Sequence, residues 1–468
     1  MPVSGLHSAL SGIRAAQFGL DTASNNIANA NTPGYTRQRV DLSAAAPTQT
    51  VTAPSGMGVT IDGVTRLRDQ FADSRARSTS AAAGETAAQA QFLTNLEQLA
   101  GEPDQGLSDA TQQLWAAFED WSNTPDSDAA RRQAMDSIAA IASTFRTTAE
   151  SWDRLGADTE KQLDTAIAEV NETLMSLHSD YNVPIANELP GMTDPTVLDQ
   201  RDQRLDRLAE LAGVTATIND DSTITVRING QSLLEPGNEP AQLSLAGGGG
   251  QTTPELRIEQ VDGTTTAAAA SGLIGGLHQA AHHDLPHWHE QLDDLAALFI
   301  DTINAQNALG MRNDGSPGGD LLGVAGNSSA AIGIALITDR TEDLAAGRAT
   351  QGPPGVFDAA NARAFADLRT AELPLNSATP EPSFDAQISG FVVGLAGAVG
   401  SAQAQQETAE SARTSAAMVQ AGQHGVSIDE EMVDLVRFQR ALEASARVLT
   451  AVDESLDVLI NRTGVVGR

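Results

Sequence analysis

The segment SNNIANANTPGYTRQ, residues 24–38, follows a regular apolar pattern near the N-terminus. Asn favours turns and caps over helix interiors, so its repetition at residues 25–31 predicts the end of a helix. Pro33-Gly34 fits a type II turn, in which Pro fixes φ at the second position and Gly supplies a positive φ at the third. We therefore expect a helix, a sharp turn and an extended segment from Tyr35 to Leu42.

Two Asn residues of this segment, Asn25 and Asn29, are four positions apart, so a helix places both on one face. An amide side chain both donates and accepts hydrogen bonds, and a buried polar residue can fix the register of paired helices. We expect these two amides to bridge neighbouring helices.

Upstream and at the opposite end of the chain, apolar residues recur with the alternating three and four spacing of a coiled-coil seam. The N-terminal positions are Leu6, Leu10, Ile13, Gln17, Leu20, Ser24 and Ile27. The C-terminal positions are Ile428, Met432, Leu435, Gln439, Leu442, Ala446, Leu449, Asp453, Leu456 and Ile460. Pairing the two ends would bury both stripes, although a local helical bundle would fit the same pattern.

The C-terminal helix carries a second apolar flank, formed by Phe438, Val448, Val452 and Val458. This flank is more than a two-helix seam needs, which suggests contacts with neighbouring subunits.

Between the ends, long helical patterns surround a short β-rich region. Apolar spacing predicts helices across residues 107–121 and 138–181 and again from Leu273. Alternation across residues 214–228, with turn residues at 219–221 and Asn229-Gly230 after it, predicts hairpins. The expected fold class is mainly α with a β insertion: terminal coiled-coil helices, an elongated central helical bundle and a small antiparallel β domain.

The charge of the chain restricts its partners. Its 61 Asp and Glu residues against 28 Lys and Arg give a net charge of −33, which disfavours nucleic acid and anionic membranes. Residues 1–46 (three Arg, two Asp) and 421–468 (five Arg, eight acids) together sum to −2, so the acidity lies between them. That distribution is expected if the ends are buried among subunits and the body faces solvent.

Residue usage also limits the chemistry and the route of export. With no Cys, disulfides and thiol catalysis are excluded. Met1-Pro2-Val3-Ser4 begins no signal peptide, and the longest apolar stretch, around Gly390–Gly400, is too short to span a membrane. If the protein leaves the cell, another export route must carry it.

The candidate metal site is a group of five of the eight His residues: His278, His282, His283, His287 and His289. His278 and His282 share a helix face at a spacing that zinc sites use, but Pro286 is expected to interrupt that helix. The run at residues 289–293 has Asp where a zinc protease needs its second His. We expect no metal, no cofactor and no enzymatic activity; a zinc-dependent enzyme built on residues 278–289 is the remote alternative.

Residues 24–38 resemble the N-terminal signature of the flagellar rod, hook and hook-associated proteins, and residues 6–20 resemble the hook-associated protein 1 family in particular. Residues 426–441, VSIDEEMVDLVRFQRA, resemble the closing helix of that family. Further similar segments lie in the interior: Leu198–Asp202, Asn304–Asn307 with Gly310, and residues 358–368.

The resemblance implies a layered organisation: an inner coiled-coil domain made by both ends, a helical rod in two parts, and an outward-facing β domain. The expected ranges are 1–45 and 421–468 for the two halves of the inner domain, 46–212 and 271–420 for the rod, and 213–270 for the β domain.

The function implied is that of a structural subunit of the bacterial flagellum that polymerises at the hook–filament junction and connects hook to filament. Implied partners are further copies of itself, the hook protein, hook-associated protein 3, an export chaperone at the C-terminal helix and the flagellar type III export apparatus. The protein would be secreted without a cleaved signal peptide. A hook or distal rod protein shares both end signatures and is the nearest alternative; a helical secreted effector is a third.

The predicted subunit-interface residues lie on both end helices and in the segment after the first. They are Leu6, Leu10, Ile13, Leu20, Asn25, Asn26, Ile27, Asn29, Pro33, Gly34, Tyr35, Met432, Leu435, Phe438, Leu442, Leu449 and Leu456.

Overall fold

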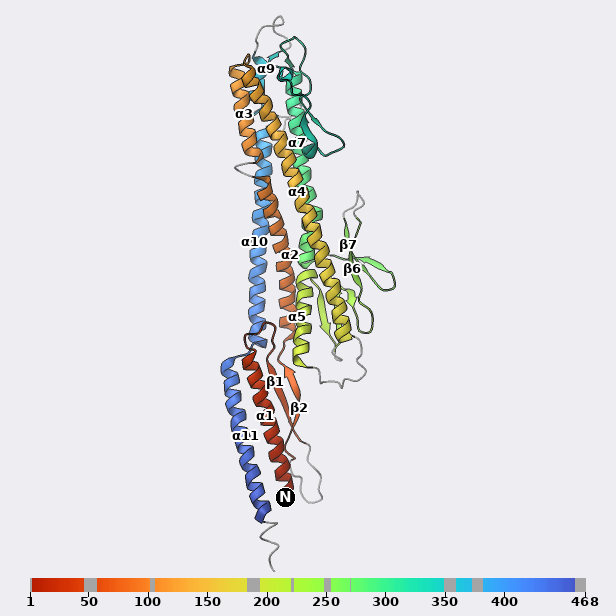
Figure 1. The fold of residues 1–468 in the computed structure, drawn as a ribbon, viewed down its shortest axis with the longest axis vertical. Helices are drawn as coiled ribbons and strands as arrows, with labels where there is room; N and C mark the ends of the chain where they lie inside the picture. Colours follow the sequence, from red (N-terminus) through yellow and green to blue (C-terminus); the bar gives the residue numbers. More distant parts are fainter. Residues whose placement is uncertain are drawn as a thin grey trace, which may run out of the picture.

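The computed structural model describes residues 2–45, 57–101, 106–182, 194–219, 223–247, 254–269, 271–348, 359–372 and 382–458. The molecule is elongated, with a terminal helix pair at one end, a long helical bundle at the other and small sheets on one flank of the bundle (Figure 1). This arrangement confirms the expected fold class, mainly α with a β insertion.

The two ends of the chain form one antiparallel helix pair, α1 (Pro2–Ala28) and α11 (Ile428–Asp457), as predicted. Three Gly residues of α1 mark where the helices touch. A Cβ added at Gly5, Gly12 or Gly19 would lie 3.2, 2.8 or 2.5 Å from Val452, Ser445 or Phe438, respectively. Each contact is seven residues further along α1 and seven back along α11, so the pairing follows a heptad.

The predicted α1 seam is wrong by one residue. Glycines and buried alanines make the contact, at Gly5, Ala9, Gly12, Ala16, Gly19 and Ala23, and the predicted stripe lies one position later. Leu6 and Leu10 are 36% and 40% exposed, and Gln17 and Ser24 are also exposed. Small residues form the contact because they let the two backbones approach closely. The larger leucines therefore lie to the side of the contact.

On α11 four of the nine described residues of the predicted seam are correct, and the first of the nine, Ile428, is 47% exposed. Leu435, Leu442, Leu449 and Leu456 are half-buried, whereas Met432, Gln439, Ala446 and Asp453 are exposed. The positions one residue before the exposed set complete the seam: Glu431, Phe438, Ser445 and Val452. Phe438 and Val452 therefore belong to the pair itself, while Val448 and Val458 remain about half exposed. Ile460 lies outside the described residues.

After α1 the chain forms a hairpin of β1 (Gln38–Ala44) and β2 (Val59–Arg66). The turn before it is the predicted one: Gly34 has φ +76°, and the Tyr35 N–H donates to the Thr32 carbonyl at 3.2 Å. The sequence predicted β1 as an extended segment but gave no sign of β2, which falls in the range 46–212. Both strands pack along α1, where Ser11 Oγ accepts the Val59 N–H.

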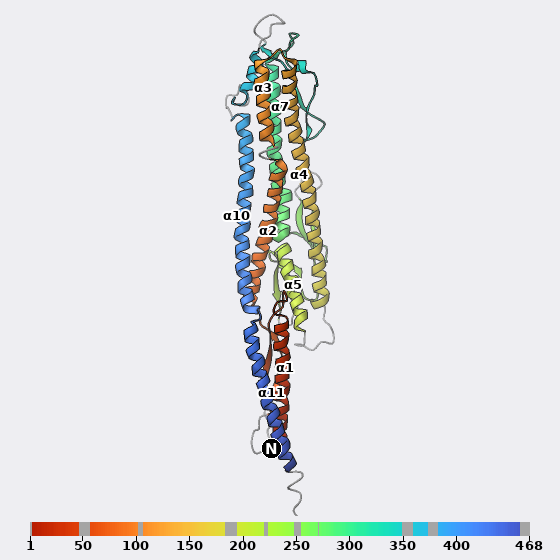
Figure 2. The same cartoon turned by 60° about the vertical axis from the view of Figure 1, so that its left-hand side comes forward.

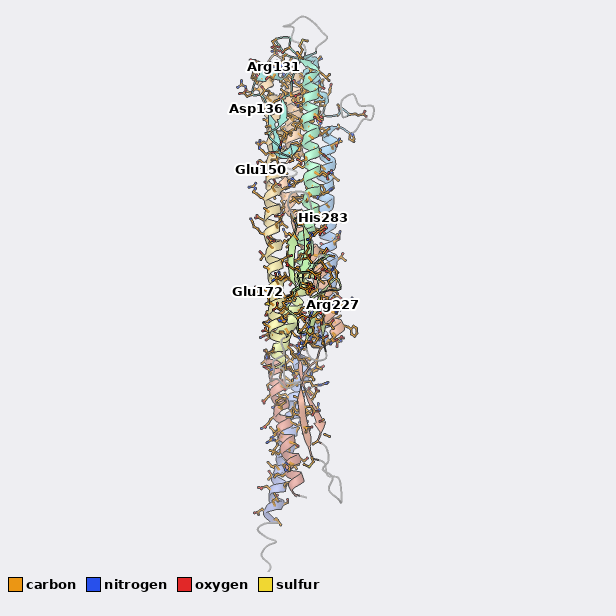
Figure 3. All side chains as sticks on the ribbon, turned by 90° about the vertical axis from the view of Figure 1, so that its right-hand side faces the viewer. Arg131, Asp136, Glu150, Glu172, Arg227 and His283 are labelled. Atoms are coloured by element: carbon orange, nitrogen blue, oxygen red, sulfur yellow. The ribbon has the colours of Figure 1, made fainter. Side chains whose placement is uncertain are left out.

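The rod is a bundle of long helices: α2 (Gln70–Ala100), α3 (Leu107–Asn123), α4 (Asp128–Leu177), α7 (Leu285–Ala308) and α10 (Phe384–His424). Figure 2 shows α10 leading into α11 along one edge of the molecule. The core contains buried aromatic rings from several of these helices, including Trp121, Phe145, Trp152 and Phe299. The acidic side chains Asp136, Glu150 and Glu172 are exposed along α4 (Figure 3).

The β domain packs beside the end of α4, its π-helical turn η1 (His178–Asn182) and α5 (Pro195–Ala212). It has two antiparallel three-stranded sheets, β3 (Thr215–Ile218), β4 (Ile224–Ile228) and β5 (Gln231–Leu234), and β6 (Gln242–Ala246), β7 (Glu255–Glu259) and β8 (Thr265–Ala267). Asn229 and Gly230 both have positive φ, as a tight hairpin turn requires, which confirms the predicted β4–β5 hairpin.

The helical pattern predicted from Leu273 begins with α6 (Gly272–Gln279) and a π-helical turn, η2 (Ala280–Asp284), which leads directly into α7. The expectation that Pro286 interrupts this helix is wrong. Pro286 lies in the first turn of α7, where the wider π turn accommodates a residue without an N–H.

The remaining short elements lie between α7 and α10. They are β9 (Gly310–Met311), β10 (Leu322–Val324), α8 (Ala330–Gly333), β11 (Ile334–Leu336), the 3₁₀ turn η3 (Thr341–Asp343), β12 (Gly347–Arg348) and α9 (Ala360–Asp367).

One helical stretch in the described part of the chain, Phe384–Asp457, is long and apolar enough to cross a membrane by length and composition alone. This qualifies the expectation that no such stretch exists. It is weak evidence for a membrane span, because helices of water-soluble cores pass the same test. The apolar side chains near the start of α10, such as Phe384, Ile388 and Phe391, are buried in the bundle.

The close approach of α1 and α11 predicts the effect of enlarging a glycine. Gly19→Leu should lower the free energy of opening the pair by about 1–3 kcal/mol, because its side chain must displace Phe438. Hydrogen exchange of the α1 amides measures this. Gly400→Leu is the matched control, since a Cβ at Gly400 meets nothing within 4 Å. Equal protection of α1 in both variants would contradict the packing described.

Candidate assembly site at the terminal helix pair and its hinge

A buried carboxylate joins the two ends of the chain. Glu431 is 2% exposed on α11, where its oxygens accept from Asn26 Nδ2 at 2.9 Å and Arg37 Nε at 2.6 Å. Asn26 is itself fully buried. Because Asn26 and Glu431 continue the heptad of the glycine contacts, this polar contact fixes the same register.

Both the nitrogen and the oxygen of the Asn26 side-chain amide form hydrogen bonds. Its Nδ2 also donates to the Gln38 carbonyl at 2.8 Å, and its Oδ1 accepts from the Gln38 N–H and the Tyr35 hydroxyl. Burial, with the nearby Asp199 and Glu431 carboxylates, raises the pKa of Tyr35 to about 12, so its hydroxyl stays protonated as a donor. The segment after α1 is thereby tied to both terminal helices.

Within one chain the register residue is Asn26, and Asn25 and Asn29 do not join α1 to α11. Asn29 Nδ2 donates to Asn25 Oδ1 at 2.9 Å on the exposed side of α1, and Thr32 Oγ1 donates to Asn29 Oδ1 at 3.2 Å. These local bonds satisfy the end of α1 among the described residues.

A network of charges connects the terminal pair to the rod. Arg66, at the end of β2, donates to Asp199 and Asp202 of α5 at 2.8 and 2.7 Å. Arg68 pairs with Asp202 and with Asp73 of α2. These carboxylates are nearly buried, so each depends on its guanidinium partners for compensation. The segment from β2 to α2, which crosses the hinge between the terminal pair and the rod, is thus fastened to α2 and α5.

The second crossing is at His424, the last residue of α10. Its carbonyl accepts the Arg37 N–H at 3.0 Å, and its Nε2 accepts the Asp69 N–H at 2.9 Å. Burial lowers the pKa of His424 below its ordinary value, although the Asp73 carboxylate, 3.5 Å from Nδ1, works in the opposite direction. The neutral ring is the form that can accept from Asp69.

A polar cavity of about 220 Å³ lies at this hinge, lined among others by Tyr35, Arg68, Asp202, Asp206 and His424. Most of these side chains are engaged in the contacts above, so the cavity is part of the hinge between the two parts of the molecule.

The His group does not assemble into a metal centre. His278 Nε2 is 2.8 Å from the Pro254 carbonyl, and the His278 and His282 rings are 4.8 Å apart. His289 lies instead beside Asp153 and Trp152. Burial and the adjacent His278 and His283 lower the pKa of His282 to about 4. Over the described ranges, no three His, Cys, Asp or Glu side chains are placed to hold a metal ion.

The predicted interface residues fall into three groups. The exposed ones are Leu6, Leu10, Asn25, Pro33, Gly34 and Met432. The half-buried ones are Ile13, Leu20, Ile27, Asn29, Tyr35, Leu435, Phe438, Leu442, Leu449 and Leu456. Only Asn26 is buried. Within one chain Asn26, Tyr35 and the half-buried α11 residues hold the pair together, whereas Leu6, Leu10 and Met432 face outward.

Sequence reasoning missed the glycine heptad and the charges of the hinge. The recurrence of Gly at positions 5, 12 and 19 was a usable signal, because a seven-residue period of small residues marks close helix contact. Arg66, Arg68 and His424 gave no such signal, since their partners lie far away in the sequence.

Three family models match the chain. The flagellar hook-associated protein FlgK helical domain matches residues 93–322, the flagellar basal body rod FlgEFG protein C-terminal region matches residues 423–462, and the flagella basal body rod protein model matches residues 6–36. The matches to both ends cover the helix pair described above. The chain belongs to the flagellar hook-associated protein 1 family.

Individual relatives agree. The flagellar hook-associated protein 1 of Bacillus subtilis is 28% identical over 99% of both chains. That of Salmonella typhimurium is 27% identical over 83% of this chain and 72% of its own. The flagellar hook junction protein FlgK from Burkholderia pseudomallei has a similar fold, with a TM-score of 0.62 at 15% identity over 74% of this chain and 99% of its own. This hook-associated protein is a structural component of the flagellar hook–filament junction that assembles within the flagellum.

The interior segments similar to this family have structural roles in the chain. Asp199 and Asp202 anchor the hinge arginines. Asn307 Oδ1 accepts the Ala345 N–H, and its Nδ2 donates to the Gly319 and Asp343 carbonyls. Asn361 accepts from Gln306 at 2.6 Å. These amides hold the loops after α7 against the rod.

The buried carboxylate predicts a position-specific loss of stability. Glu431→Ala should lower the free energy of separating α1 from α11 by roughly 3 kcal/mol, because Asn26 and Arg37 lose a buried partner. Glu430→Ala is the matched control: Glu430 also pairs with Arg37 but is 64% exposed, so about 1 kcal/mol or less is expected. Hydrogen exchange of both helices measures the difference; similar losses would contradict the role of Glu431.

The hinge predicts a pH dependence. Because the folded pKa of His424 is below its ordinary value of 6.5, its contribution to stability is full above that value and is lost as pH falls through the folded pKa. Acid should therefore reduce the exchange protection of the Asp69 amide before the rod opens. The glutamine of His424→Gln does not titrate, so this acid-induced loss of protection at the Asp69 amide should disappear in that variant. If the loss remained, a group other than His424 would be responsible for it.

Proposed function

We propose that this protein polymerises at the hook–filament junction through its terminal helices and has a structural, non-catalytic role there. The observation that carries the proposal is the outward apolar surface of the helix pair. Leu6, Leu10, Met432 and Val433 are 36–68% exposed on a pair of helices of only 27 and 30 residues. Such surfaces on a helix pair favour further helix packing.

The predicted subunit-interface residues enter this proposal in two roles. Asn26, Tyr35, Leu435, Phe438, Leu442, Leu449 and Leu456 preserve the pair that is presented to neighbours. Leu6, Leu10, Ile13, Leu20 and Met432 supply the surface that neighbours contact. In this arrangement the exposed acidic side chains along α4 of the rod face solvent.

The specific partners proposed are the hook protein on one side of the junction and hook-associated protein 3 on the other. Before assembly, an export chaperone would cover α11, and the flagellar type III apparatus would export the chain without a cleaved signal peptide. The exposed apolar side chains of α11 support the chaperone proposal, since an unassembled subunit gains solubility when they are covered.

Deletion of the gene followed by complementation tests the junction role. Cells that lack the protein should make hooks without filaments and release flagellin into the medium. Purified protein added to such hooks should restore filament growth. Absent or truncated hooks would instead assign the chain to the hook or rod, and unaltered flagella would refute the proposed function.

A further inference from the structure

A continuous helical segment joins the two apolar cores of the molecule. Ile274 and Leu277 of α6 belong to the core that the β domain shares with α4 and α5, whereas Trp288 and Leu292 of α7 belong to the aromatic core of the rod. The π-helical turn η2 lies between α6 and α7 and connects them without a break. Because π turns inside helices are frequent at functional sites, η2 is a candidate joint between the β domain and the rod.

Three histidine rings are grouped at this turn, and we call His278, His282 and His283 the histidine cluster. The centroid of the His278 ring lies 4.8 Å from that of His282 and 6.0 Å from that of His283. His278 Nε2 is 2.8 Å from the carbonyl oxygen of Pro254, which directly precedes β7. Figure 3 shows His283 on the rod close to the β domain. The cluster therefore lies where the β domain and the rod meet.

His282 is the buried member of the cluster. It is 9% exposed, and its Nε2 has no hydrogen-bond partner among the described residues. A positive charge on this ring would lose its hydration without gaining a partner. Burial, together with charges on His278 and His283, accordingly lowers its pKa to about 4. At neutral pH the ring is neutral, and the closed turn resists its protonation.

The carboxylates nearest the turn on η2 and α2 are engaged by other groups. Asp284, the last residue of η2, accepts from Gln89 Nε2 at 3.0 Å. Glu85 of α2 accepts the Gly272 N–H, and burial raises its pKa above the ordinary value. A raised carboxyl pKa means that uptake of a proton favours the folded state, so Glu85 acts in the opposite direction to His282 in acid.

The faces of α4 and α7 toward the turn supply no counter-charge for His282. An added Cβ at Gly156 of α4 would collide with Leu285, so this glycine admits the start of α7. His289 of α7 lies 3.3 Å from Asp153 of α4, where a positive charge on that ring would be compensated. The other charged or titratable side chains at this height are exposed, so solvent screens them: Arg154, Asp158 and Glu160 on α4, His287 and Glu290 on α7, and Glu255 on β7.

We propose that the histidine cluster is an acid-sensitive joint, which loosens the β domain from the rod when His282 takes up a proton. The charged ring is stable only in water, so protonation opens η2. Opening separates His278 from Pro254 and releases the packing of α6 on the β domain, while α7 stays in the core of the rod. This joint lies far from the terminal helices and does not depend on the proposed polymerisation.

Hydrogen exchange of the full chain, corrected for the intrinsic pH dependence of exchange, tests the joint. Because the folded pKa of His282 is below its ordinary value of 6.5, its contribution to stability is full above 6.5 and is lost as pH falls toward about 4. Between about pH 7 and about pH 5 the equilibrium constant for opening of the η2, α6 and β7 amides should therefore rise roughly tenfold. The amides of α3 should change little.

Two pairs of variants assign this rise to the cluster. In His282→Leu an apolar side chain that cannot titrate replaces the buried ring, so the rise should disappear. His287→Leu, at an exposed neighbouring position, is the matched control and should keep it. His283→Glu places a carboxylate beside His282 and should reduce the rise to roughly threefold or less, because the proton gains a partner. His287→Glu makes the same change in charge outside the cluster and should leave the rise intact.

The possible outcomes decide between the joint and a general effect of acid. A rise that persists in His282→Leu would overturn the proposal, as would a wild-type chain without any rise at η2. If His282→Leu does not fold, equal rises in His283→Glu and His287→Glu would overturn it alone. A rise confined to η2, with α6 and β7 unchanged, would contradict the release of the β domain.

Discussion

The structure of both chain ends depends on one buried carboxylate and on the hydrogen-bonding and charged partners that it requires. Glu431 is removed from water on α11, and a buried charge is tolerated only when it is paired and hydrogen-bonded. Its partners, Asn26 and Arg37, come from the other end of the sequence. Arg37 in turn donates its N–H to His424, so the same group of contacts joins the terminal pair to the end of α10. Other registers of the helix pair would leave this charge without its partners.

Close packing has a second consequence for the surface. Gly5, Gly12 and Gly19 bring α1 so near α11 that bulkier residues cannot occupy the contact line. The leucines one position later are displaced to the side of the pair, where a single copy has nothing to cover them. A helix pair built on leucines would have buried its apolar residues and left a polar exterior. The small-residue contact instead keeps large apolar side chains available for assembly.

The hinge explains how a slender molecule holds its two parts in line. Two chain segments cross it, from β2 to α2 and from α10 to α11, and polar contacts fasten both of them. Arg66, at the end of β2, and Arg68, two residues later, meet aspartates on α5 and α2. The rod has its own aromatic core, to which the terminal pair contributes no residue among those described.

The sequence by itself determined the long helices, the turn at Pro33-Gly34 and the β4–β5 hairpin, because these follow from local periodicity and backbone preference. Matching apolar stripes favoured pairing of the two ends without deciding it. The signatures at both ends also indicated the family. The tertiary structure decided which face of each terminal helix is buried. A stripe of leucines and a stripe of glycines and alanines one residue apart have the same period, so hydrophobicity favours the first while the distance between the backbones selects the second. It also decided the hinge, since the partners of Arg66, Arg68, His424 and Glu431 are distant in sequence, and charge alone does not specify which carboxylate meets which cation.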